Sequence, residues 1–305
     1  MNHVTQELLA AVSDWAGSFS GAFNIREDGG CAGRQSTEHV KIEPKQFQPG
    51  LDIRILPGTH GETVSIPAIV THGNVDDLVY NDFFVGEGAD VTIVAGCGVH
   101  TEDASAARHN GIHRFFLSKG AHVRYVEKHL GTGHGTGLRS IDPVTEATLE
   151  EDAVLEMDTS QIGGVDRTTR TMKATVGPRA KLLIHERLLT EGDQQAKTDF
   201  EVVLDGEDSG VDLISRSVAR GNSHQAYRSR IVGNARCTGH SECDAIIADN
   251  GTVDAAPELT ASHGDAALIH EAAIGKIAGE QILKLRTLGL TESEAEAKIV
   301  AGFLK

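Results

Sequence analysis

GADVTIVA at residues 88–95 shows the motif that decides the fold of this 305-residue chain. The motif starts with a turn residue, continues with Ala or Val and then any residue, and ends in an apolar strand. Further copies follow: GAHVRYVE at 120, EDAVLEMD at 151, GPRAKLLIHE at 177, GVDLISRS at 210, GNARCTGH at 233 and GDAALIHE at 264. Because almost nothing between residues 51 and 270 sustains a helical period, these runs indicate a protein made of short strands.

The spacing of the motif separates two β folds. Its second residues are Ala89, Ala121, Ala153, Ala180, Val211, Ala235 and Ala267, so the successive steps in sequence number are 32, 32, 27, 31, 24 and 32. A repeat of about 30 residues with imperfect identity indicates a solenoid of stacked rungs. A β-sandwich also repeats its turns, but it has no reason to keep a longer period. We therefore expect a mainly β protein with a parallel β-helix over residues 51–275.

Polar residues alternate with apolar ones inside the predicted strands. They include His122, Arg124, Lys181 and His185. A sheet with one solvated face requires this alternation, and so does a solenoid with a partly polar interior.

Residues 1–50 are expected to form a helix and a tether. Leu8, Leu9, Val12 and Trp15 follow at helical spacing behind Thr5, a suitable N-cap, and predict a helix over residues 5–16. Residues 17–50 are rich in Gly, Ser, Pro and charge, with Cys31 in their middle, and predict a loop.

A helical hairpin is expected at residues 276–305. The first helix carries Ile282, Leu285 and Leu288 on one face, and Gly289 follows at the position that favours a left-handed residue. Thr291 and Glu294 form a capping-box pattern that opens a second helix, which carries Ile299 and Phe303. The hairpin either caps the solenoid or docks a partner.

The charge and hydropathy of the chain exclude some functions. It has 28 Lys+Arg against 44 Asp+Glu and a net charge of −16, which argues against nucleic-acid binding. No stretch approaches the roughly 18 apolar residues that a membrane span requires. The start MNHVTQELLAAVSDW lacks the basic and apolar regions of a signal peptide, so we expect a cytoplasmic protein.

Cysteine, histidine and glutamate near the C-terminus suggest a metal or cluster site. The four cysteines, at 31, 97, 237 and 243, are too few for a disulfide framework. Cys243 lies about one rung before His270 and Glu271 in the sequence, so the three side chains are expected to meet at one edge of the solenoid. They suit zinc or an iron-sulfur centre, and three ligands would leave a place for a second subunit.

The order of motifs resembles the SufB/SufD family of iron-sulfur cluster assembly proteins. The matching landmarks are Gly-Glu within Leu204–Glu207, Tyr227-Arg228, Cys243-Asp244, Pro257, His270-Glu271-Ala272, Glu280-Gln281 and Gly302-Phe303. The segment GCGVHTEDASAARHNGIHRFFLSKGAHVRYVEKH, which begins at Gly96, is similar to the family's earlier rungs. The likeness covers roughly residues 60–305.

The resemblance implies a right-handed parallel β-helix that serves as a scaffold for a nascent iron-sulfur cluster and is not itself an enzyme. It implies that Cys243, His270 and Glu271 hold the cluster. These residues represent both halves of a site that the family usually divides between two paralogues. A homodimer is therefore expected, in a 2+2 complex with a SufC-like ABC ATPase.

Further roles also follow from the resemblance. Cys97 resembles the internal cysteine that accepts sulfur, and Lys128 and His129 fall near where the family lines its sulfur path. Leu285, Leu288, Ile299 and Phe303 of the hairpin would dock the ATPase. A sulfur donor and apo-protein acceptors would be transient partners.

Two alternatives remain at this point. An adaptor of the SufD type would support the complex without holding a cluster. A carbohydrate-active β-helix enzyme would use acidic pairs such as Glu150-Glu151 and the acidic residues within 205–208. Those acids fall at turns, and one Trp and three Tyr offer few platforms for a sugar ring.

Overall fold

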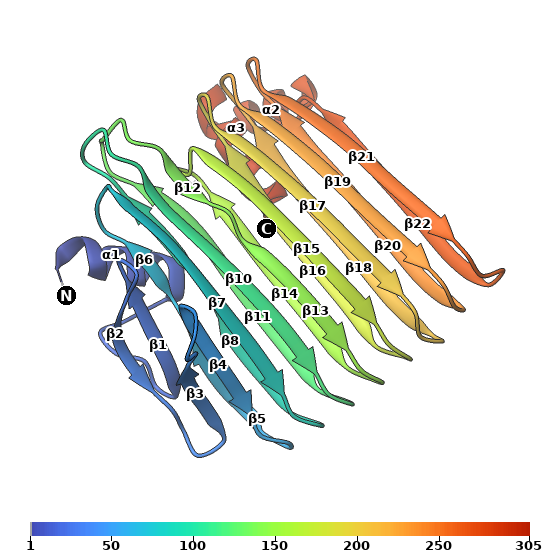
Figure 1. Cartoon of the computed structure of the whole chain (residues 1–305). Coiled ribbons are helices and arrows are strands. Elements are labelled where there is room, and N and C mark those ends of the chain that lie inside the picture. Colours follow the sequence, from blue (N-terminus) through green and yellow to red (C-terminus); the bar gives the residue numbers. More distant parts are fainter. Residues whose placement is uncertain (1) are drawn as a thin grey trace.

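The computed structural model describes residues 2–305 and is a parallel β-solenoid with two helices near its C-terminus, which confirms the predicted fold class (Figure 1). The strands form two sheets. One sheet contains β1 (Ala22–Glu27), β2 (Gly30–Gln35), β5 (His60–Ser65), β6 (Ala68–Val70), β8 (Asp90–Val94), β9 (Cys97–His100), β11 (His122–Thr132), β14 (Val154–Ile162), β16 (Lys181–Thr190), β18 (Ser209–Ala219), β20 (Cys237–Ile247) and β22 (Ala266–Gly275). The other contains β3 (Val40–Pro44), β4 (Gly50–Ile55), β7 (Val75–Val85), β10 (Ala107–Leu117), β12 (Arg139–Ile141), β13 (Val144–Leu149), β15 (Arg167–Val176), β17 (Gln195–Leu204), β19 (His224–Gly233) and β21 (Thr252–Ala261).

The rungs stack with a regular register. His122 pairs with Asp90, and Val154 pairs with His122 after an equal step along the chain. The steps between later rungs are shorter by a few positions. The predicted step from Val211 to Ala235 is wrong, because Val211 pairs with Gly239. The turn motif varies in position, whereas backbone hydrogen bonding keeps the strands in register.

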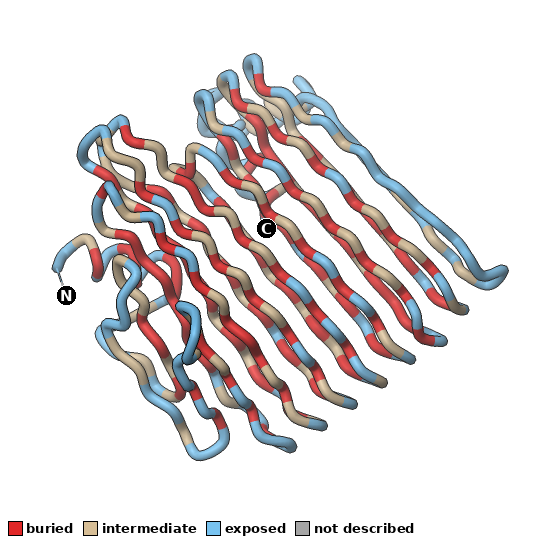
Figure 2. Tube along the Cα trace, in the orientation of Figure 1, coloured by how far each residue is buried: buried red, intermediate tan, exposed pale blue. Residues whose placement is uncertain are grey.

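The core lies between the two sheets. Buried residues alternate with partly or fully exposed ones along most of the long central strands, as Figure 2 shows in red, tan and pale blue. Side chains one rung apart stack on one another: the Phe83 and Phe115 rings are 4.6 Å apart and nearly parallel, and Tyr125 meets Phe115 edge to face at 5.1 Å. Apolar residues at every second position therefore build one continuous core.

The predicted tether over residues 17–50 is wrong, since most of it is folded. β1 lies parallel to β5 and β6, and β2 pairs with β1. β3 forms an antiparallel pair with β4. These short strands have little local signal, and pairing with the solenoid supplies their hydrogen bonds. Cys31 lies on β2 and is exposed.

The N-terminal helix α1 (His3–Ser13) is present, but its N-cap is Asn2, not Thr5. The Asn2 side chain accepts a hydrogen bond of 2.8 Å from the Thr5 amide. Leu8 and Leu9 pack against the first sheet. A β-carbon at Gly96 would lie 2.0 Å from the carbonyl oxygen of Val12, so only glycine permits this close approach.

The C-terminal hairpin consists of α2 (Gly279–Thr287) and α3 (Glu292–Phe303). The predicted capping box of Thr291 and Glu294 is present, and Gly289 has a φ of 97° just after the end of α2. Val300 of α3 packs against Val218 of β18. Within residues 2–305, no helix has both the length and the hydropathy needed to cross a membrane.

The two ends of the solenoid differ. At the N-terminal end β1, β2 and β3 extend the sheets and α1 packs against the first sheet, whereas β21 and β22 form the last edges at the other end (Figure 1). Leu268 on β22 is only partly buried although it packs against the core, and Leu259 and Ile269 are exposed. Apolar side chains and unpaired backbone groups are thus accessible at the C-terminal end.

We predict that Gly96→Ala destabilises the protein by about 1–3 kcal/mol, because the added methyl group overlaps the backbone of α1. Urea unfolding followed by circular dichroism measures the loss. Gly264→Ala is the matched control, since a β-carbon there meets no heavy atom within 4 Å. Equal stability of the two variants would contradict the close packing of α1.

Candidate functional site

Cys97 lies inside the solenoid. Gly96 and Gly98 leave room for α1 on the outer side of β9, and the alternation then turns Cys97 and Val99 inward. Cys97 is 4% exposed. The sequence Gly-Cys-Gly therefore packs a helix against one face of the strand and places a cysteine on the other.

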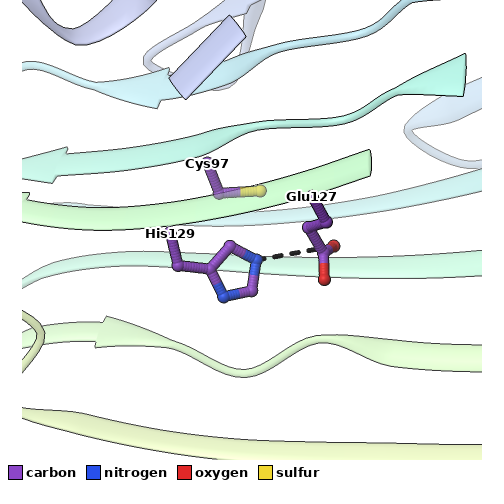
Figure 3. A group of neighbouring side chains, drawn as sticks. All are labelled: Cys97, Glu127 and His129. Atoms are coloured by element: carbon purple, nitrogen blue, oxygen red, sulfur yellow. Dashed lines mark ion pairs between the residues drawn. The ribbon is translucent and has the colours of Figure 1, made fainter. Parts of the chain in front are cut away.

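Cys97 belongs to a buried cluster with Glu127 and His129 of β11 (Figure 3). One ligand atom of each residue lies within 4.8 Å of the others. His129 Nε2 lies 3.4 Å from Glu127 Oε1, and His129 pairs with Cys97 across the strands. Lys128 points outward, where its ammonium group lies 2.8 Å from Asp14. Of the neighbours Lys128 and His129, it is therefore His129 that lines the interior.

Arg170 of β15 joins this cluster to the next rungs. Its guanidinium donates a 2.7 Å hydrogen bond to Glu127 and lies 3.4 Å from Glu186 of β16. Glu186 also accepts hydrogen bonds of 2.8 Å from Thr198 and 2.7 Å from Ser215. A line of polar groups therefore runs along the interior, and each carboxylate in it has a cationic or hydroxyl partner.

A second branch leaves Glu127 in the other direction. The Tyr125 hydroxyl donates to Glu127 at 2.8 Å and lies 2.8 Å from His113 Nδ1. Further along, His109 Nδ1 lies 3.0 Å from Asp77. The site therefore contains more buried ionisable groups than its three potential ligands.

Burial and charge shift the pKa values of these groups. Burial, and then the negative charge of Glu127, raise the pKa of the Cys97 thiol well above its usual value. Burial alone would raise the pKa of Glu127, but Arg170 and His129 together hold it well below its ordinary range. Burial lowers the pKa of His129. The resting site thus holds a thiol, a carboxylate and a neutral imidazole at neutral pH.

Cys243 of β20 lies at the other end of the polar line. It is 2% exposed, faces inward and pairs with Ser215, which binds Glu186. Burial, and then Glu186 and Asp244, raise the pKa of its thiol to about 12. Five strand spacings separate β9 from β20, so Cys97 and Cys243 lie about 24 Å apart along the solenoid.

Of the three residues expected to meet, the register places Cys243 and His270 on one face of the sheet and Glu271 on the other. His270 pairs with the inward-facing Ser241, so it shares the inner face with Cys243, two positions along the strand. Glu271 pairs with Glu242 and lies on the outer face, because neighbouring residues of a strand point to opposite sides. In residues 2–305, His270 Nδ1 is buried and has no hydrogen-bond partner.

The hairpin residues proposed for docking differ in exposure. Leu288 is 72% exposed, whereas Phe303 packs with Val300 against β18 and is partly buried. Leu285 and Ile299 are also half-buried. Leu283, which the helical pattern did not single out, is 61% exposed. Leu283 of α2 and Leu288, which directly follows the helix, are therefore exposed apolar side chains that the hairpin offers to a partner.

Sequence reasoning missed Glu127, Arg170 and Glu186. The polar residues that it named inside the strands, His122, Arg124, Lys181 and His185, are not among the buried ones. The buried polar residues also occur at alternate positions. Their pattern becomes informative only when the register shows which positions face inward.

Comparison with known proteins shows the family of this chain. A family model for "SUF system FeS cluster assembly, SufBD core domain" matches residues 80–303. The chain belongs to the SufBD family. The match covers the second half of β7 through α3, so it includes Cys97, Cys243 and the whole polar line between them.

Several archaeal relatives carry the name iron-sulfur cluster assembly SufBD family protein. One from Methanothermobacter thermautotrophicus is 30% identical over 262 residues, which are 84% of this chain and 62% of the relative. One from Archaeoglobus fulgidus is 31% identical over 275 residues, 89% of this chain and 72% of the relative. The chain thus spans less than two thirds of the length of the Methanothermobacter relative. Membership in this assembly family argues against the carbohydrate-active alternative.

We predict that Arg170→Met destabilises this SufBD-family chain by about 3–5 kcal/mol at neutral pH, because two buried carboxylates lose their cation. In the wild type the low pKa of Glu127 contributes stability above the ordinary carboxyl pKa, and this contribution is lost on acidification. In the variant burial raises that pKa, so protonation relieves the uncompensated charge. The difference in stability should therefore shrink between about pH 7 and about pH 4.

Urea unfolding at several pH values measures the Arg170→Met effect. Arg236→Met is the control, since Arg236 forms an exposed pair with Asp208 and its loss should change little. A pH-independent deficit in Arg170→Met would contradict the charge argument.

Proposed function

We propose that this SufBD-family chain is a scaffold on which an iron-sulfur cluster is assembled. One observation carries the proposal: two buried inward-facing cysteines lie at the ends of a line of polar groups inside the solenoid, and the second lies near the open C-terminal end. A purely structural core would have no reason to bury Glu127, Arg170 and Glu186 there.

Cys97 is the site that receives sulfur in this proposal. The neutral imidazole of His129 accepts the thiol proton as the Cys97 sulfur attacks the terminal sulfur of a donor persulfide. The sulfur-sulfur bond of the donor breaks, and the donor thiolate leaves. The product is a persulfide on Cys97. Arg170, which already contacts Glu127 and His129, would stabilise its negative charge.

The cluster would form between Cys243 and His270 at the open end. A separation of about 24 Å prevents direct transfer between the two thiols, so sulfur would pass along the polar interior. A second copy of the chain, docked on β21 and β22, would shield the site and complete its ligands. The exposed Leu259 and Ile269 and the unpartnered His270 Nδ1 support a dimer through this end.

The hairpin would bind a SufC-like ABC ATPase. β22 ends at Gly275 and α2 begins at Gly279, so the strand that carries His270 leads almost directly into the hairpin. α3 also packs on β18 through Val300 and Val218. Movement of the ATPase would thereby reach the edge strands and open the dimer interface.

The central test is anaerobic reconstitution with iron and sulfide in complex with the ATPase. Wild type should gain a charge-transfer absorbance and about one cluster per dimer, and Cys243→Ala should gain neither. Cys31→Ala, an exposed thiol on β2, should behave like wild type. If wild type holds no iron, the chain is an adaptor of the SufD type and the scaffold proposal fails.

The docking proposal is tested by the double variant Leu283→Asp and Leu288→Asp. Both side chains are exposed, so the solenoid should stay folded while charged groups disrupt an apolar interface. We expect pull-down of the ATPase to fall at least about ten-fold. Phe47→Asp is the control, because Phe47 is 97% exposed near the opposite end of the molecule. Undiminished binding by the double variant would refute docking through α2.

A further inference from the structure

The outer face of β20 and β22 carries a second group of potential metal ligands. His240 and Glu242 alternate with Ser241 and Cys243 along β20, and Glu271 stands beside Glu242 on β22. One ligand atom each of His240, Glu242 and Glu271 lies within 4.8 Å of the others. The group thus lies on the opposite side of the same strand pair from Cys243 and His270.

His240 is already oriented for a metal ion. Its Nδ1 lies 2.8 Å from Asp212 Oδ1, so Nδ1 donates its proton to that carboxylate. This tautomer leaves Nε2 with a free lone pair, and Nε2 lies 3.8 Å from Glu271. A carboxylate that holds one imidazole nitrogen while the other binds metal is the usual second-sphere arrangement of histidine ligands.

His122 shows that a histidine between two carboxylates does not by itself make a metal site. There Nδ1 lies 3.4 Å from Asp90 and Nε2 lies 3.1 Å from Glu156. Each nitrogen thus has its own carboxylate on its own side of the ring, and the two acids cannot share one ion. At His240 the glutamates gather instead with one ligand atom of the ring.

One cation lies near the group. The Arg216 guanidinium is 3.8 Å from Glu242 and offsets part of the negative charge. Its side chain is 40% exposed, so it can turn into solvent when an ion binds. Glu271 is 67% exposed, which leaves the group open to ions from solution.

We propose that His240, Glu242 and Glu271 bind a divalent first-row metal ion, with Fe(II) as the ion relevant to cluster assembly. One imidazole and two carboxylates suit such ions, and they leave coordination positions for water. A site without thiolate would hold Fe(II) loosely enough to release it. The side chains come from neighbouring strands of one sheet, so no rearrangement is needed to bring them together.

The role of this ion rests on the function proposed above. Iron would collect on the outer face of β20 and β22, while sulfur reaches Cys243 on the inner face. β22 is the last strand of its sheet, so only its free edge separates the two faces. This arrangement would supply both components of the cluster at one strand pair without mixing them earlier.

Anaerobic Co(II) titration of the full-length protein tests the metal site. Co(II) held by nitrogen and oxygen gives visible d–d bands, whereas a thiolate ligand adds a strong near-ultraviolet charge-transfer band. Wild type should show d–d bands without that charge-transfer band at one ion per chain. His240→Ala should lose them, and Asp212→Asn should weaken binding by about 10- to 100-fold. His122→Ala is the matched control and should bind like wild type.

Two results would overturn the metal site. One is the absence of d–d bands in wild type. The other is a thiolate charge-transfer band that Cys243→Ser removes while His240→Ala leaves binding unchanged, because the ion would then belong to the inner face.

The supply role has a separate readout. At limiting Fe(II), His240→Ala should assemble clusters several-fold more slowly than His122→Ala, and excess Fe(II) should restore the rate. An unchanged rate at limiting iron would refute the supply role. Failure of the scaffold proposal is distinguishable, since wild type would then bind Co(II) at the outer group yet form no cluster even with excess iron.

Discussion

The two-residue alternation of a β-strand, kept in register by backbone hydrogen bonds between rungs, is the constraint on which this molecule depends. It turns Cys97, Glu127 and Cys243 inward and sends their sequence neighbours outward. A shift of one residue in the register would exchange the two faces. Since parallel pairing joins each rung to the next, the interior forms one continuous column from β9 to β20. The site is therefore a property of the stack and not of any single rung.

The interior of the solenoid is unusual because it contains buried charged side chains. Removing a carboxylate or a guanidinium from water costs several kcal/mol, which an ion pair only partly recovers. Glu127, Arg170 and Glu186 share this cost because the arginine serves both acids and hydroxyl groups complete the shell of Glu186. Replacing buried ion pairs by well-packed apolar residues is often neutral or stabilising. The proposed sulfur chemistry would give these groups a role that folding alone does not require.

The two ends of the solenoid differ, and the proposed sites follow that difference. At the N-terminal end, β1 to β3 extend the sheets and α1 packs against the first sheet, so Cys97 is enclosed. At the C-terminal end β21 and β22 are open, and the hairpin packs on the outer face of β18 and not over the edge. The inner pair Cys243 and His270 and the outer group around His240 both lie at this accessible end. A solenoid of this kind can thus be closed to solvent along its length and reactive at one edge.

Much of this organisation was accessible from the sequence. The recurring turn-and-strand motif predicted the parallel β-helix, the capping box and Gly289 located the hairpin, and the ordered motifs around Cys243 and His270 identified the family. These features are local or periodic, so they can be read along the chain. The tertiary structure decided what depends on rung length: the strands within residues 17–50, the pairing of Glu271 with Glu242 on the face away from Cys243, and the meeting of Arg170 with Glu127 from 43 residues away. Each pairing depends on the number of residues in the strands and turns between its two partners. No local sequence pattern determines that number.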